Sequence, residues 1–170
     1  MSVVQVIALC VAAVAGVIDI RCHRIPNWLT FGSAGVALAY HAVSGGGEGL
    51  IVASLGWSLG AAAFFLPFAL GGLGAGDVKL VAALGAWLGP GDALWLALFT
   101  GVAGGLLALG VALARGYLRE AVGNLWLLLM HWRVAGVTTL PEMTLQRGRG
   151  PRQAYGVAIF AGTVVTVWIR

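Results

Sequence analysis

Apolar residues are concentrated in six segments of the chain, and the stretches between them carry most of the polar and charged residues. Each segment is long enough, or nearly so, to cross about 30 Å of hydrocarbon as an α-helix. The segments cover approximately residues 2–19, 28–43, 50–70, 78–89, 93–114 and 153–169. The pattern predicts an all-α, polytopic membrane helix bundle of about six transmembrane helices, in a single domain that spans residues 1–170.

Composition agrees with this pattern. Hydrophobic residues make up 60% of the 170 positions and charged residues only 9%, and the mean hydropathy is +0.95, so lipid is the natural solvent for most of the chain. Only Gly-Pro-Gly-Asp, residues 89–92, separates the fourth and fifth segments. A re-entrant hairpin is therefore an alternative for these two segments, although we favour two crossings.

The basic residues fall almost entirely on one side of the predicted bundle. When the segments are numbered in order, Arg170 is the only basic residue on the opposite side. Because basic residues mark cytoplasmic loops, loops 20–27, 71–77 and 115–152 are predicted to be cytoplasmic and both termini to lie outside. The net charge of +4 is thus a topology signal. We expect membrane lipid and no nucleic acid among the partners.

The last cytoplasmic loop contains an apolar and aromatic stretch, residues 121–132, that is too short to cross. We predict a short interfacial helix there, lying along the membrane surface or packed under the bundle. The following stretch, residues 138–152, contains Pro, Gly and Arg and is expected to be the least ordered segment. Cys10 and Cys22 are suited neither to a disulfide nor to a metal cluster, and we expect no metal site and no cofactor.

Two of the six acidic residues lie in unusual positions. Asp19 ends the first apolar segment and Asp77 opens the fourth, so the predicted topology brings both to the same membrane depth at the cytoplasmic side. A carboxylate beside hydrocarbon is costly and calls for a partner or a function. The remaining acidic residues have a solvated explanation in loops or turns: Glu48, Asp92, Glu120 and Glu142.

Each of the two aspartates also has a purely structural explanation. Asp77 precedes an apolar helix, where an aspartate can act as the N-cap and accept bonds from the first free amides. Asp19 can be a boundary residue that pairs with Arg21 or Arg24. If both explanations held, however, the two placements at one depth would be a coincidence.

Two carboxylates within hydrogen-bonding reach share a proton, because both cannot ionise easily. The ionised member can take a proton from a water molecule, while the protonated member hydrogen-bonds the scissile carbonyl and the proton later passes to the leaving amine. This is aspartyl peptidase chemistry, which requires neither a metal nor a covalent intermediate. Gly74 and Gly76, just before Asp77, would let a peptide substrate lie against the backbone.

The motifs around these aspartates resemble those of the type IV prepilin peptidase family. GAGDVK (74–79) resembles the family's GxGDxK motif, and DIRCHRIPNW (19–28) resembles its first catalytic segment, D-x-R followed by I-P-N. QAYGVAI (153–159) resembles the P-[YF]-[GA]-x-A-I segment in part, because Ala154 stands where proline is usual. The GxGD element alone also resembles presenilin and signal-peptide-peptidase enzymes, but their other motif, Y-D, has no counterpart here.

The resemblance implies that Asp19 and Asp77 are the catalytic pair of an intramembrane aspartyl endopeptidase at the cytoplasmic face of the bacterial inner membrane. Its substrates would be prepilins or pseudopilins, which carry a basic leader followed by a hydrophobic helix. Larger family members have an extra domain with paired Cys-x-x-Cys motifs and methylate the new amino terminus. This chain is similar to the short, peptidase-only branch of tight-adherence (Flp) pilus systems, so neither an N-terminal zinc or methyltransferase domain nor methyl transfer is expected.

Five other residues near the pair are candidates for supporting roles or substrate contacts. Lys79 either extends to the membrane surface or acts electrostatically, by tuning the aspartates or by meeting an acidic residue of the substrate. Arg21 and Arg24 are topology signals or substrate contacts. Pro26 stiffens the end of its loop and Asn27 is expected to cap the helix that follows.

A non-enzymatic function is the main alternative. A membrane carrier or a pilus-assembly scaffold would use the same two aspartates for proton relay or for ion pairing. A carrier, however, is expected to place an ionisable group near the membrane midplane. The interiors of the segments contain no Asp, Glu, Lys, Arg or His there, and the polar residues Ser54, Ser58 and Thr100 are neutral.

Overall fold

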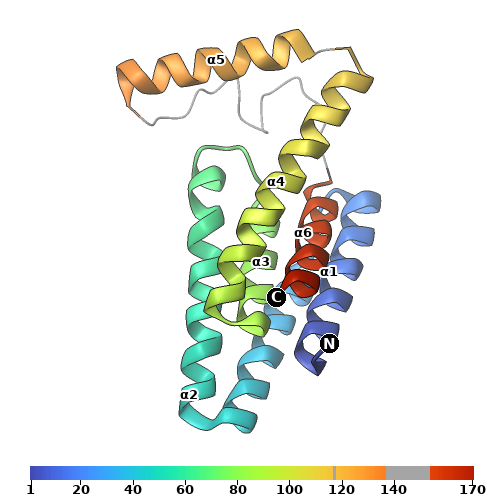
Figure 1. Cartoon of the computed structure of the whole chain (residues 1–170), viewed down its shortest axis with the longest axis vertical. Helices are drawn as coiled ribbons and strands as arrows, with labels where there is room; N and C mark the ends of the chain where they lie inside the picture. Colours follow the sequence, from blue (N-terminus) through green and yellow to red (C-terminus); the bar gives the residue numbers. More distant parts are fainter. Residues whose placement is uncertain (117, 137–153) are drawn as a thin grey trace.

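A computed structural model describes residues 1–116, 118–136 and 154–170, and these residues contain helices and no strand (Figure 1). The helices are α1 (Val3–Cys22), α2 (Asn27–Ala69), α3 (Ala75–Leu88), α4 (Pro90–Ala114), α5 (Leu118–Ala135) and α6 (Tyr155–Ile169). By length and composition, α1, α2 and α4 are able to cross a membrane, and α6 is a shorter apolar helix. The predicted all-α membrane helix bundle is confirmed.

Helix α2 contains two of the predicted segments, 28–43 and 50–70, in one helical run that turns back on itself at Gly46. This residue has φ 59° and ψ −142°, a conformation that residues with a side chain rarely adopt. The two arms of α2 consequently run antiparallel, with the turn at the end of the bundle away from α5 (Figure 1). The expected loop around Glu48 is therefore wrong, because that residue is helical.

Two other predicted loops are also shorter than expected. Helix α1 continues to Cys22, so Arg21 is helical. His23 is the C-cap of α1: it has a left-handed backbone (φ 51°), and its N–H donates to the Asp19 carbonyl at 2.8 Å. Between α3 and α4 only Gly89 (φ 84°) is non-helical, since Pro90 begins α4. Proline fits the first position of a helix because its missing N–H would have no partner there.

Helix α3 lies at the centre of the bundle, in contact with α1, α2, α4 and α6 (Figure 1). Every residue from Leu80 to Trp87 is buried. A helix that is covered on all sides must be apolar all round, which explains why residues 80–87 include no charged side chain. The first turn of α3, which carries Asp77, is thereby fixed by its neighbours.

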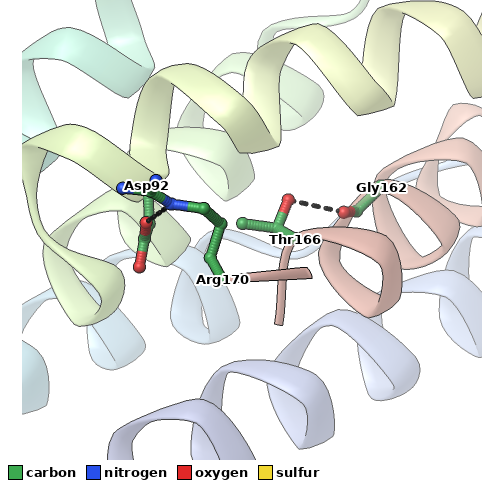
Figure 2. Close-up of polar contacts among 4 residues, drawn as sticks. All are labelled: Asp92, Gly162, Thr166 and Arg170. Atoms are coloured by element: carbon green, nitrogen blue, oxygen red, sulfur yellow. Dashed lines mark hydrogen bonds and ion pairs between the residues drawn. The ribbon is translucent and has the colours of Figure 1, made fainter. Parts of the chain in front are cut away.

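The end of the bundle away from α5 is joined by an ion pair between α4 and α6. The Arg170 Nε atom lies 3.2 Å from Asp92 Oδ1, while one helical turn earlier the Thr166 hydroxyl donates to the Gly162 carbonyl at 2.7 Å (Figure 2). Asp92, expected to be solvated in a turn, is thus paired with the one basic residue predicted for that side. Because both side chains are partly exposed, the pair contributes at most about 1 kcal/mol.

Helix α5 lies across one end of the bundle, beyond the C-terminal end of α4 (Figure 1). It includes the apolar stretch 121–132, for which a short helix was predicted, and it leaves Trp126 and Val134 exposed. An exposed apolar face on a helix in this position suits the membrane interface. The segment 138–152, expected to be the least ordered, lies outside the described residues.

Candidate active site

The structure places the two aspartates at the same end of the bundle. Asp19 lies in the last turns of α1 and Asp77 in the first turn of α3, at the end that α5 crosses (Figure 1). Both are buried, with only 6% and 8% of their surfaces exposed. Buried carboxylates need hydrogen-bond partners, and each of these has a backbone amide as its partner.

The Asp19 carboxylate is held by the first turn of α6. Its Oδ2 atom accepts a hydrogen bond of 2.8 Å from the backbone N–H of Gly156, and this contact is buried. In the described part of the chain Asp19 makes no ion pair with Arg21 or Arg24, both of which are exposed. The boundary-pair explanation of Asp19 is therefore wrong for this structure.

The Asp77 carboxylate is held by its own helix start. Gly74 is the N-cap of α3, and its N–H donates to Asp77 Oδ2 at 3.0 Å. Asp77 is consequently the third residue of the helix and not its N-cap, as the structural explanation supposed. From the third position of the helix, the carboxylate accepts the hydrogen bond of the N-cap amide, as the acidic residue of a capping box does.

Burial alters the acidity of Asp77, which precedes the apolar segment 78–89. Its pKa is raised to about 6, chiefly because burial disfavours the charged form; the hydrogen bond from Gly74 opposes this effect, and the charge of Asp19 adds to it. The two carboxylates are therefore close enough to interact electrostatically. Asp77 keeps its proton to a higher pH than an ordinary aspartate.

The two glycines before Asp77 have intramolecular neighbours. A Cβ atom on Gly74 would lie 3.2 Å from Asp77 Oδ2, and one on Gly76 would lie 3.2 Å from the Cβ of Ile25, in the connection between α1 and α2. Contacts this short require the neighbour to shift. The glycines thus allow the start of α3 to approach its own carboxylate and the α1–α2 connection, and this gives them a structural reason apart from substrate access.

Lys79 connects the two sequence motifs to each other. Its Nζ atom donates to Asn27 Oδ1 at 2.9 Å and lies 5.0 Å from the centroid of the Phe31 ring. Pro26 is the N-cap of α2 and makes no side-chain capping bond, so the expected capping role of Asn27 is wrong. The Asn27 side chain instead bridges the start of α2 to Lys79 in the N-terminal part of α3.

This bridge predicts an energetic coupling between Asn27 and Lys79. Each of Asn27→Ala and Lys79→Met removes the same hydrogen bond, so we expect a double-mutant cycle on the free energy of unfolding in detergent to give a coupling of about 0.5–1 kcal/mol. The matched cycle with Arg21→Met in place of Lys79→Met should give additive effects, because exposed Arg21 has no such bond. Additivity in both cycles would contradict the bridge.

An open cleft of about 500 Å³ lies beside this bridge, at the junction of α1 and α2. Arg24, Pro26 and Asn27 line it together with apolar side chains that include Ile25 and Trp28. Three of the predicted supporting residues therefore share one surface next to the start of α3. Ile25 also faces Gly76, so the cleft adjoins the helix turn that carries Asp77.

Two residues of the site were not assigned from the sequence, namely Tyr155 and Gly156. Gly156 holds Asp19, and the Tyr155 phenol is close enough to Asp77 for an electrostatic interaction. The partial match of residues 153–159 to a family segment was the signal for them. It did not indicate a contact with either aspartate, because that contact depends on how α6 packs.

No group of three or more His, Cys, Asp or Glu side chains suited to a metal ion is found in the described ranges. Cys10 and Cys22 are exposed free thiols. Among the described residues, the buried ionisable groups at this end of the bundle are the two aspartates, with the partly buried Tyr155 beside them.

Fold and site together define a membrane helix bundle with two buried, amide-bound carboxylates at one end. The model of the type IV leader peptidase family matches residues 6–109, more than half of the chain, and this protein therefore belongs to that family. In comparisons with curated proteins and with solved structures, none matches. The resemblance to prepilin peptidases is confirmed, and membership implies a peptidase with prepilin substrates. Both aspartates lie in the matched region, whereas Gly156 lies beyond it.

Proposed function

We propose that this protein is an intramembrane aspartyl endopeptidase that removes the basic leader from Flp-like type IV prepilins at the cytoplasmic face of the bacterial inner membrane. Asp19 and Asp77 would activate the attacking water. The observation that carries the proposal is the pair of buried carboxylates, each held by a backbone amide, at one end of the bundle. Groups with unusual environments of this kind cluster at functional sites.

The chemistry requires one proton on the pair. Burial and the neighbouring charge favour the proton on Asp77, which makes Asp77 the member that hydrogen-bonds the scissile carbonyl oxygen, while Asp19 takes a proton from water. The hydroxide oxygen forms a bond to the carbonyl carbon. As the tetrahedral intermediate collapses, the bond from carbon to nitrogen breaks and the nitrogen receives a proton from the pair.

The position of the pair suits a prepilin. Basic residues dominate the predicted loops at this end of the bundle, which supports a position of the aspartates at the cytoplasmic surface. A substrate helix can then remain in the bilayer while its leader lies at the surface, beside the cleft between α1 and α2. The same position disfavours the alternative of a membrane carrier, which is expected to use an ionisable group at the midplane. A pilus-assembly scaffold would not require two buried carboxylates at one end of the bundle.

Cleavage of a defined peptide tests the proposal. We expect the purified protein in lipid vesicles to cut a synthetic peptide with a basic leader, a glycine and a hydrophobic helix at one bond, as measured by mass spectrometry. EDTA should leave the rate unchanged, because two carboxylates suffice for this mechanism. An intact peptide would contradict the peptidase proposal, and loss of cleavage on chelation with recovery on adding a divalent ion would contradict the mechanism.

A further inference from the structure

The first turn of α6 reaches the Asp19 carboxylate from the far end of the sequence. The Gly156 N–H and Asp19 Oδ2 are separated by 137 positions in the chain and form a buried hydrogen bond of 2.8 Å. Gly156 is the second residue of α6, so its amide has no partner within the helix. An unpaired amide at a helix start is a suitable donor to a carboxylate.

The contact requires glycine at position 156. A Cβ atom there would lie 2.9 Å from the Asp19 Cβ, 3.1 Å from Asp19 Oδ2 and 3.3 Å from the Cα of Gly16. On the facing helix, a Cβ on Gly16 would lie 3.4 Å from the Gly156 carbonyl oxygen. The backbones of α1 and α6 therefore touch at this point, and any side chain on Gly156 would push the amide away from the carboxylate.

Tyr155 anchors the same turn to two other helices. Its ring makes an edge contact with Phe64 of α2 at a centroid distance of 6.2 Å, and its hydroxyl lies 3.5 Å from the Thr100 carbonyl of α4. Gly104 of α4 leaves room for the ring, because a Cβ on it would collide with Tyr155. Contacts with α1, α2 and α4 thus fix the direction in which the Gly156 amide points.

We propose that Gly156 is a positioning residue for the peptidase reaction, whose backbone amide orients the Asp19 carboxylate toward Asp77. The inference rests on the proposed function. In the described part of the chain this amide is the one hydrogen-bond donor to the Asp19 side chain. Without it the carboxylate can rotate away from the attacking water, so the chemical step suffers more than substrate binding does.

The first test is Gly156→Ala, assayed on the peptide described above after gel filtration confirms a folded, monodisperse protein. We expect kcat to fall on the order of 10- to 100-fold and KM to stay within about twofold, since a hydrogen bond to a charged group is lost. The pH profile of kcat should also change, because the proposed chemistry requires one proton on the pair and the amide acts on one of its two members. Gly105→Ala is the control: its Cβ would meet nothing within 4 Å.

A second variant covers the case in which Gly156→Ala does not fold. Replacing Gly156 by glycolic acid, through an amide-to-ester substitution, removes the N–H without adding a Cβ. The control is the same ester at Gly162, which removes an N–H group of α6 that lies away from both aspartates. A lower kcat and an altered pH profile for the ester at 156 alone support the inference. If the wild-type protein is active and the ester at 156 has the same kcat and pH profile as the wild type, the inference is overturned. If the wild-type protein itself is inactive, the proposed function is overturned instead.

Discussion

Asp19→Asn and Asp77→Asn are each expected to abolish prepilin cleavage, with a loss in kcat of at least about 1,000-fold. Asparagine cannot take a proton from water or supply one to the leaving amine, so both halves of the proposed acid–base pair are needed. The rate is measured on the purified variants with the synthetic peptide. Residual cleavage near the wild-type rate in either variant would contradict the proposed mechanism.

The structure predicts that both variants remain folded. Each asparagine retains a carbonyl oxygen that can accept the existing backbone bond, from Gly156 at position 19 and from Gly74 at position 77. Asp92→Asn is the matched control, since Asp92 is paired with Arg170 at the opposite end of the bundle. It should cleave at the wild-type rate and lose no more than about 1 kcal/mol of stability.

Asp77→Asn should also show a pH-dependent gain in stability. The pKa of Asp77 is raised to about 6 in the folded protein. The stability that the protonated Asp77 carboxyl contributes to the wild type is therefore fully present below the ordinary aspartate pKa, and it is lost as the pH rises through about 6. Asparagine does not titrate. We therefore compare the free energy of unfolding of the variant with that of the wild type, in detergent, at two pH values. The difference in favour of the variant should be about 1–3 kcal/mol larger at pH 7.5 than at pH 3.5. A difference that does not change with pH would contradict the raised pKa of the buried Asp77 carboxyl.

Gly56→Leu is expected to prevent the protein from folding, and Gly56→Ala to destabilise it by about 3 kcal/mol. A Cβ on Gly56 would collide with the Gly85 carbonyl oxygen and lie 2.9 Å from the Gly89 carbonyl carbon, both of them backbone atoms that cannot move independently. The approach of α2 to α3 therefore depends on the absence of a side chain, as at other close crossings of membrane helices. The measurement is the yield of monodisperse protein and its denaturant midpoint.

Gly101→Ala is the control for this effect. A Cβ on Gly101 of α4 would meet nothing within 4 Å, so the same substitution should be neutral or stabilising by up to about 1 kcal/mol through helix propensity. Any folded Gly56→Ala protein should also lose activity, because α3 carries Asp77. Equal stability of the two variants would show that α2 and α3 can separate without cost and would contradict the packing described above.

The sequence by itself determined the helices and the side of the membrane on which the aspartates are expected. A membrane span must satisfy its backbone internally and cross a fixed thickness of hydrocarbon, and both requirements act on local composition. The apolar segments therefore predicted α1, both arms of α2, α3, α4 and α6. Asp19 and Asp77 were distinguishable because a carboxylate beside hydrocarbon is costly wherever it occurs.

Only the tertiary structure decided the partners of these side chains. Neither the hydrogen bond from Gly156 to Asp19 nor that from Lys79 to Asn27 follows from composition, because each depends on how one helix is rotated and how far it is shifted along its neighbour. In lipid the apolar faces of helices are nearly equivalent, so rotation is set by the positions at which glycines permit backbone contact. Those positions act in pairs distant in sequence, as Gly16 and Gly156 do, and a pair becomes visible only when the helices are packed.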